Sequence, residues 1–205
     1  MFHMNKLHTL LLAVFMIGLG FACSEAEAPE EENEVEIFTD VELIFTAEDG
    51  SHVVRALAED PTGGLGIDSR FTVEPITLRP NTAYILTFEL LNRLVSPVED
   101  VQKEIRDEDD EHQMFFEFTR DVFSDPMGIG NIEDRDGAIN YLDFDDNGLP
   151  LGLKTRWVTG GPVMGAEFRV WLAHQPGVKS ATSTATDGDV DFDITFELNI
   201  VAQED

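Results

Sequence analysis

Strand-like runs of alternating apolar and polar residues recur along the chain after residue 35. In the segment AYILTFELL (83–91), every second side chain from Tyr84 to Leu90 is apolar and shares one face, as in a half-buried β-strand. Turn residues such as Gly, Pro, Asn and Asp separate the runs. We expect strands over residues 35–47, 52–59, 71–78, 83–91, 113–123, 139–144, 149–159, 167–174 and 190–201.

A single helix interrupts this series. The segment Ser96–Glu99 has the form of a capping box with proline at the first helical position. Val98, Val101 and Ile105 then recur at three- and four-residue steps, which predicts a helix over 97–110. The chain is therefore expected to be mainly β: an immunoglobulin-like antiparallel β-sandwich of eight or nine strands with one short helix inserted near 97–110.

The first residues read as a bacterial lipoprotein signal. Lys6 precedes an apolar run over 10–21, and Ala22 precedes Cys23, the only cysteine. The run of about twelve residues is shorter than the roughly 20 that a membrane-spanning helix needs. We expect a signal peptide over 1–22, lipidation of Cys23 and attachment to the membrane through its acyl chains. An ordinary secretory signal cut near Ala22 is the alternative.

The stretch after Cys23 is rich in glutamate and has no large apolar residue until Val35. Such a composition cannot bury enough surface to order itself, so residues 23–35 are expected to form an acidic disordered tether. Residues 36–205 then form a single β-sandwich domain. The expected location is the outer membrane, facing the periplasm or the cell surface.

The charge balance narrows the function. The chain has 13 Lys and Arg against 41 Asp and Glu, a formal net charge of −28 at pH 7. Nucleic acid is excluded as a partner because phosphate binding needs clustered basic residues. Such acidity suits a solvated surface protein or one that binds cations. No nucleophile, phosphate-loop or zinc-protease motif is present, so we do not expect an enzyme.

Two histidines are candidate metal ligands. His112 adjoins an acidic run over 107–111, and continuing the helical step from Ile105 turns its side chain toward the body of the protein. His174 ends the strand EFRVWLAH. Imidazole with the carboxylates of Glu108 and Glu111 suits zinc or another divalent transition metal. Alternatively, the histidines bond to backbone and the acidic run is a solvated helix end.

A second acidic motif suggests calcium. Asp143, Asp145 and Asn147, followed by Gly148, match the front half of a calcium-binding loop. Position twelve is Lys154, so the loop is no EF-hand. Asn147-Gly148 between strand-like runs equally predicts a type I′ hairpin turn.

Four aspartates alternate with apolar residues at the start of the last strand. Period-2 alternation puts all four on one face, which is a solvated outer face or a calcium-bridged edge. These residues are Asp187, Asp189, Asp191 and Asp193.

Several segments together resemble an uncharacterised group of Bacteroidota lipoproteins that often carry the label "type 1 periplasmic binding fold superfamily". The matching segments are LRPNTAYILTFELLN (78–92), EDVQKEI (99–105), EHQMFF (111–116), LGLKT (151–155), HQPGVK (174–179) and DVDFDITF (189–196). The resemblance implies an accessory role beside an outer-membrane receptor. The label implies an α/β fold, whereas the strand-rich pattern predicts a β fold.

Two functions follow as hypotheses. The first is a lipid-anchored binding module in the cell envelope, a metal or small-ligand accessory to an outer-membrane importer, in which His112 and His174 meet beside the acidic run. The second is a structural or adhesive surface lipoprotein without a small ligand, with scattered histidines and an exposed apolar patch.

Overall fold

The computed structural model describes residues 36–64, 66 and 70–202. The expected signal peptide, Cys23 and the expected tether lie outside these residues. The chain from Val35 onward forms one compact unit. In the described part, no helix has the length and apolarity needed to cross a membrane.

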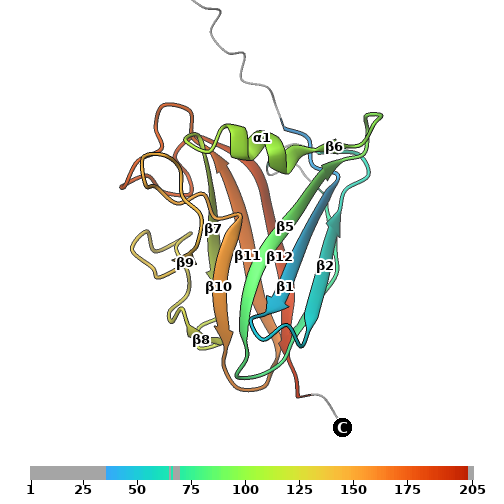
Figure 1. The fold of residues 1–205 in the computed structure, drawn as a ribbon, viewed down its shortest axis with the longest axis vertical. Helices are drawn as coiled ribbons and strands as arrows, with labels where there is room; N and C mark the ends of the chain where they lie inside the picture. The colour runs from blue at the N-terminus through green and yellow to red at the C-terminus, as the bar shows by residue number, and fades with distance from the viewer. Residues whose placement is uncertain (1–35, 65, 67–69, 203–205) are drawn as a thin grey trace, which may run out of the picture. The chain divides into compact units, whose positions relative to one another are not determined.

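Two β-sheets pack face to face, and one short helix lies across an end of the sandwich (Figure 1). The mainly β sandwich with one short helix is therefore confirmed. The elements are β1 (Asp40–Ala47), β2 (Val53–Glu59), β3 (Thr72–Val73), β4 (Ile76–Leu78), β5 (Ala83–Asn92), β6 (Glu99–Asp100), α1 (Val101–Asp107), β7 (His112–Phe118), β8 (Phe123–Asp125), β9 (Asn140–Tyr141), β10 (Lys154–Thr159), β11 (Val163–His174) and β12 (Asp189–Ile200).

The larger sheet has the order β3-β2-β1-β5-β10-β8, with β6 paired to β5 and β9 to β10. The smaller sheet has the order β4-β12-β11-β7. All pairs are antiparallel except β4 with β12, which run parallel. This parallel pair departs from the all-antiparallel expectation.

The described residues contain twelve strands where eight or nine were expected, because two expected strands are each split between the sheets and β6 forms within the predicted helix. The segment 71–78 gives β3 in one sheet and β4 in the other, on either side of Pro75, which has no N–H to donate to a ladder. Likewise, 113–123 gives β7 and β8, with Asp121 at φ 67° where the chain changes sheets.

Aromatic side chains dominate the space between the sheets. Trp157 of β10 is fully buried and lies edge-on to Phe168 of β11, with ring centroids 5.0 Å apart. Phe116 of β7 packs at 5.4 Å from the same indole. Offset and edge-to-face pairs add to the stabilisation from apolar burial. This apolar filling leaves the polar cluster described below at one end of the core.

Helix α1 begins later than the capping box predicted. Glu99 and Asp100 pair with Asn92 and Leu91 of β5 as strand β6, so the helical backbone begins only after them. Asp100 is the N-cap residue and makes no side-chain cap hydrogen bond. The predicted start at Pro97 is therefore wrong, as is the predicted end near Asp110.

Candidate metal centre

The two candidate histidines meet at the α1 end of the smaller sheet. His112 is the first residue of β7 and His174 the last of β11, and the antiparallel register pairs them directly. Their rings stack with centroids 4.3 Å apart and an angle of 8° between planes. Both side chains face the core, because each histidine lies two positions along its strand from a buried core residue, Met114 in β7 and Leu172 in β11. The helical continuation that we used to orient His112 is wrong, since His112 belongs to a strand.

Glu36 approaches both rings from the residues just before β1. Its Oε1 lies 3.1 Å from His112 Nε2, and its Oε2 lies 3.9 Å from His174 Nδ1. The side chain is buried, and burial opposes its ionisation, but the contact with His112 outweighs burial and lowers the pKa of Glu36. Sequence reasoning missed Glu36 because this residue follows several other glutamates and no local pattern distinguishes it from them.

Asp191 joins the cluster through a β-bulge in β12. Leu172 pairs with Phe192 and Ala173 with Val190, so Asp191 is the extra residue. A bulge shifts the alternation of faces and re-aims a side chain. Asp191 Oδ2 lies 3.6 Å from His112 Nε2. The expectation that all four alternating aspartates share one outer face is therefore wrong for Asp191.

Asp193 and Asp187 have other partners. Asp193 forms a two-point ion pair with Arg169, the shorter contact being 2.7 Å. Asp187 accepts hydrogen bonds from the backbone N–H and the hydroxyl of Thr184. These contacts fix the loop and the outer face of β12. Asp189 is exposed and belongs to neither group of potential ligands, so Asp191 is the carboxylate of the four that faces the histidines.

Burial sets the protonation of the cluster. Burial, and then the nearby charge of Glu36, raises the pKa of Asp191 to about 8. Burial lowers the pKa of His112, but Glu36 and Asp191 together outweigh it, and the pKa is raised. Burial and the neighbouring charges therefore favour an ionised Glu36 beside His112 and Asp191, both of which hold a proton more firmly than they would in water.

Three buried atoms in the cluster have no well-aligned hydrogen bond: Glu36 Oε1, His112 Nε2 and Asp191 Oδ2. Unsatisfied buried polar atoms are rare and require an explanation. The 3.6 Å separation from Asp191 falls within the spacing of ligands around one ion, and the 3.1 Å separation from Glu36 is slightly shorter. Four ligands about 2.0–2.2 Å from a tetrahedral ion lie about 3.3–3.6 Å from one another.

The other nitrogen of His112 has a partner suited to a ligand. His112 Nδ1 lies 3.2 Å from the backbone oxygen of Glu108 and can donate to it. Metal-binding histidines commonly donate their second N–H to a carbonyl, which leaves the first nitrogen free to bind the ion. With Nδ1 engaged in this way, Nε2 faces Glu36 and Asp191.

The acidic run contributes two side chains beside His174. Glu111 Oε2 lies 3.3 Å from His174 Nε2, and Glu108 belongs to the same group of potential ligands. The four predicted ligands therefore divide between two adjacent groups. The buried group is Glu36, His112, His174 and Asp191, and the outer group is Glu108, Glu111 and His174.

The loop after β11 holds His174 and Glu111 in place. The backbone N–H of Gln175 donates to the backbone oxygen of Glu111 at 2.6 Å, and the buried Gln175 side-chain amide donates to the backbone oxygens of Thr184 and Asp187. Gly188 has φ 89°, and a Cβ there would come within 2.2 Å of the His174 oxygen. Only glycine therefore permits this close approach of β12 to the end of β11.

The calcium-like motif serves as a turn. Asp145 accepts hydrogen bonds from the backbone N–H groups of Asn147 and Leu149, and its Oδ2 lies 3.0 Å from Nζ of the buried Lys179. Asp143 accepts from the Gly152 N–H. Within the described residues, neither aspartate belongs to a group of three or more potential metal ligands. These contacts favour the hairpin interpretation over a calcium site.

The hairpin turn differs in type from the prediction. Gly148 has φ 79°, but Asn147 is not among the described residues with positive φ. A type I′ turn requires positive φ at both central residues, so that prediction is wrong. The N–H of Gly148 donates to the Asp145 oxygen, and the N–H of Asp145 to the Leu149 oxygen, as in a three-residue loop with glycine at its last position.

The fold and the cluster together define a β-sandwich with a buried histidine–carboxylate centre. Scans of protein-family models, curated proteins and solved structures find no match to this chain. The resemblance to Bacteroidota lipoproteins therefore stays a prediction, and the functional argument depends on the geometry of the site.

Proposed function

We propose that this protein is a divalent-metal-binding module of the cell envelope, anchored through lipidated Cys23. The observation that carries the proposal is the buried convergence of His112 Nε2 with Glu36 and Asp191, three groups whose facing atoms lack aligned hydrogen bonds. Two imidazoles with two carboxylates favour zinc or a similar transition metal over calcium, which prefers six to eight oxygen ligands.

Charge balance supports an ion at this position. Glu36 and Asp191 carry two negative charges when both are ionised, and one divalent cation neutralises them. When no ion is bound, the raised pKa values of His112 and Asp191 favour protons on these groups instead. Ion binding should therefore release protons from them, because metal ligands must be deprotonated.

The stacked histidines favour binding over the adhesive alternative, which expected them to be scattered. An exposed apolar loop that includes Leu94, Val95 and Val98 does lie between β5 and β6, and it supports a contact surface as a second role. An accessory role beside an outer-membrane importer remains part of the proposal, because a lipid-anchored metal binder is suited to supplying such a receptor.

Metal titration tests the proposal. The full chain carrying Cys23→Ala, which removes the only thiol as a ligand, is stripped with a chelator and titrated with Zn²⁺, Co²⁺ and Ca²⁺. We expect tight binding of Zn²⁺ and Co²⁺ with release of protons at pH 7, measured calorimetrically in buffers of different ionisation enthalpy. At a hundredfold over its dissociation constant, the ion should stabilise the protein by about 2.7 kcal/mol.

Two substitutions provide the matched comparison. His112→Gln should abolish tight binding, whereas His52→Gln should not, because His52 contacts Tyr84 Oη and belongs to neither ligand group. Absence of Zn²⁺ and Co²⁺ binding by the parent chain would refute the metal function. Equal binding by the two variants would refute the assignment of the site.

A further inference from the structure

The two ligand groups share His174, and this shared ring suggests how an ion could reach the buried group. The side chain of His112 is 0% exposed, and those of Glu36 and Asp191 are buried as well. The side chains of Glu108 and Glu111 are 43% and 35% exposed. One group is therefore dry and the other is open to solvent.

The two ring nitrogens of His174 face the two groups. Nδ1 lies 3.9 Å from Glu36 Oε2, and Nε2 lies 3.3 Å from Glu111 Oε2. A neutral imidazole has one N–H and one lone pair, and either nitrogen can be the metal ligand. Exchange of the tautomer moves the lone pair from the Glu111 side to the Glu36 side without rotation of the ring and without net loss of a proton.

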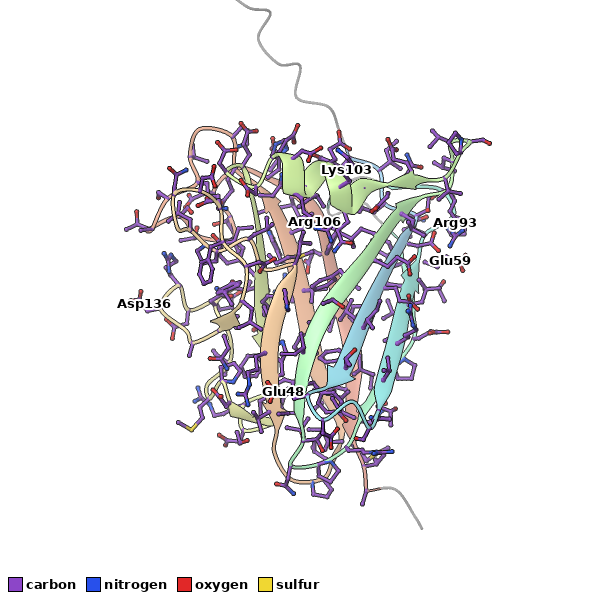
Figure 2. The ribbon with its side chains drawn as sticks, in the orientation of Figure 1. Glu48, Glu59, Arg93, Lys103, Arg106 and Asp136 are labelled. Carbon is purple, nitrogen blue, oxygen red and sulfur yellow. The ribbon has the colours of Figure 1, made fainter. Side chains whose placement is uncertain are left out.

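The surface beside the outer group is acidic. A shallow hollow of about 490 Å³ along α1 is bordered mainly by carboxylates and reaches Glu108. Lys103, labelled on α1 in Figure 2, borders the same hollow but is paired with Asp107. A surface lined by one sign of charge raises the local concentration of counter-ions and their association rate.

On the basis of the proposed metal function, we propose that Glu108, Glu111 and His174 form an outer loading position for a divalent cation. The cation then passes to the buried position formed by Glu36, His112 and Asp191, with His174 taking part in both. Glu108 and Glu111 thus govern the rate of loading, whereas the buried groups govern affinity. No electron transfer is involved; the bonds that change are between the ion and its ligands.

The kinetics of Zn²⁺ uptake test this step. In the full chain with Cys23→Ala, Zn²⁺ association is followed by stopped-flow against a fluorescent chelator, and affinity is measured at equilibrium. The double variant Glu108→Gln/Glu111→Gln keeps side-chain size and removes both charges. We expect its association rate to fall about tenfold or more, since electrostatic steering raises association rates by about tenfold at the low end of its range. Its dissociation rate should fall by a similar factor, because the ion leaves by the same path, so affinity stays nearly constant.

Glu59→Gln/Glu133→Gln serves as the matched control, since it removes two exposed glutamate charges that belong to neither ligand group and do not border the hollow along α1. Its association rate should stay close to that of the parent chain. Equal slowing in the control and the test variant would overturn the proposal, because the effect would then reflect general charge alone.

Three other outcomes also overturn the loading step. Unchanged rates in the Glu108→Gln/Glu111→Gln variant would show that the outer group is not on the path. A faster release with an unchanged association rate would show that Glu111 merely orients His174. Uptake of two Zn²⁺ ions at equilibrium would show a stable two-ion centre instead. If the parent chain binds no Zn²⁺, the proposed function itself fails, which is a distinct result.

Discussion

Asp191 differs from the other aspartates of β12 because its carboxyl group is buried beside another carboxylate. Removal from water disfavours its ionised form, and the charge of Glu36 disfavours it further. The nearby His112 holds a proton more firmly for the opposite reason, since two acids surround it. Both groups therefore carry more protons in the folded chain than in the unfolded chain.

The metal-free protein should lose stability as the pH rises from 6 to 9. A group whose pKa is higher in the folded state stabilises the fold at low pH, and this stabilisation is lost as the pH rises through that pKa. Asp191 rises from 3.8 to about 8. It should account for a decrease of about 2–3 kcal/mol in the free energy of unfolding.

Urea denaturation in the presence of a chelator measures this decrease. Asp191→Asn should flatten the pH dependence, whereas Glu197→Gln, which alters an exposed position farther along the same strand, should leave it unchanged. A parent-like decrease in Asp191→Asn would contradict the assignment of the raised pKa.

Lys179 and Asp145 form an ion pair in which both side chains are almost completely buried. Lys179→Met would leave the carboxylate of Asp145 buried without its cation. Breaking a buried pair by removing one partner typically costs about 3–5 kcal/mol. Chemical denaturation should show a loss of this size, while Lys154→Met, at an exposed position of β10, should change stability by less than about 0.5 kcal/mol. Similar losses in both variants would contradict this role.

At the scale of elements, helix α1 shows how pairing overrides a local signal. The sequence Ser96–Glu99 suits a helix start, but its last residue pairs with β5, and the helix begins at Val101. Val98, expected on the buried face with Val101, is instead 48% exposed. The ladder hydrogen bonds of β6 satisfy backbone groups that a longer helix would have used.

Substitutions along this segment should distinguish the predicted helix start at Pro97 from the observed start at Val101. Val101→Ala should reduce the free energy of unfolding by about 2 kcal/mol, since Val101 is buried. Ser96→Ala and Val98→Ala should each change it by less than about 0.5 kcal/mol. A loss of about 1 kcal/mol in Ser96→Ala would indicate the capping box that the structure lacks. Denaturant titration of the three variants decides the matter.

Strand β12 is the second element in which position depends on more than local sequence. Its bulge between the partners of Leu172 and Ala173 turns Asp191 inward. The backbone oxygen of Asp191 accepts a hydrogen bond from the N–H of Gly66, which bridges this strand from a distant loop. The inward carboxylate therefore depends on contacts among three separate parts of the chain.

At the scale of the whole molecule, the net charge of −28 makes the protein a general attractor of cations. General attraction does not select a transition metal, because it acts on every cation and is weakened by salt screening. The selective part of the proposal lies in the buried ligand group, whose two histidines stand at the paired ends of β7 and β11, and α1 lies across this end of the sandwich (Figure 1). Long-range charge thus attracts cations to the protein, and the local ligand set then selects the metal.

Membrane attachment is the prediction that concerns the whole chain. If Cys23 is acylated, labelled palmitate should enter the parent protein in a Gram-negative host, and Cys23→Ala should abolish the labelling and release the protein to the soluble envelope fraction. Equal labelling of both chains, or no labelling of either, would remove the basis for a lipid anchor. The Zn²⁺ titration described above does not depend on this result.

The sequence by itself determined the mainly β character, because the alternation of apolar side chains is a local property of each strand. It also singled out His112 and His174, since few histidines are present and both lie at predicted element ends. Only the tertiary structure decided the partners of these rings. Glu36 is one of many glutamates, and Asp191 is turned inward by a bulge, so neither is distinguishable by local pattern. Strand register and sheet pairing are non-local, and they bring together residues that lie as much as 155 positions apart, from Glu36 to Asp191.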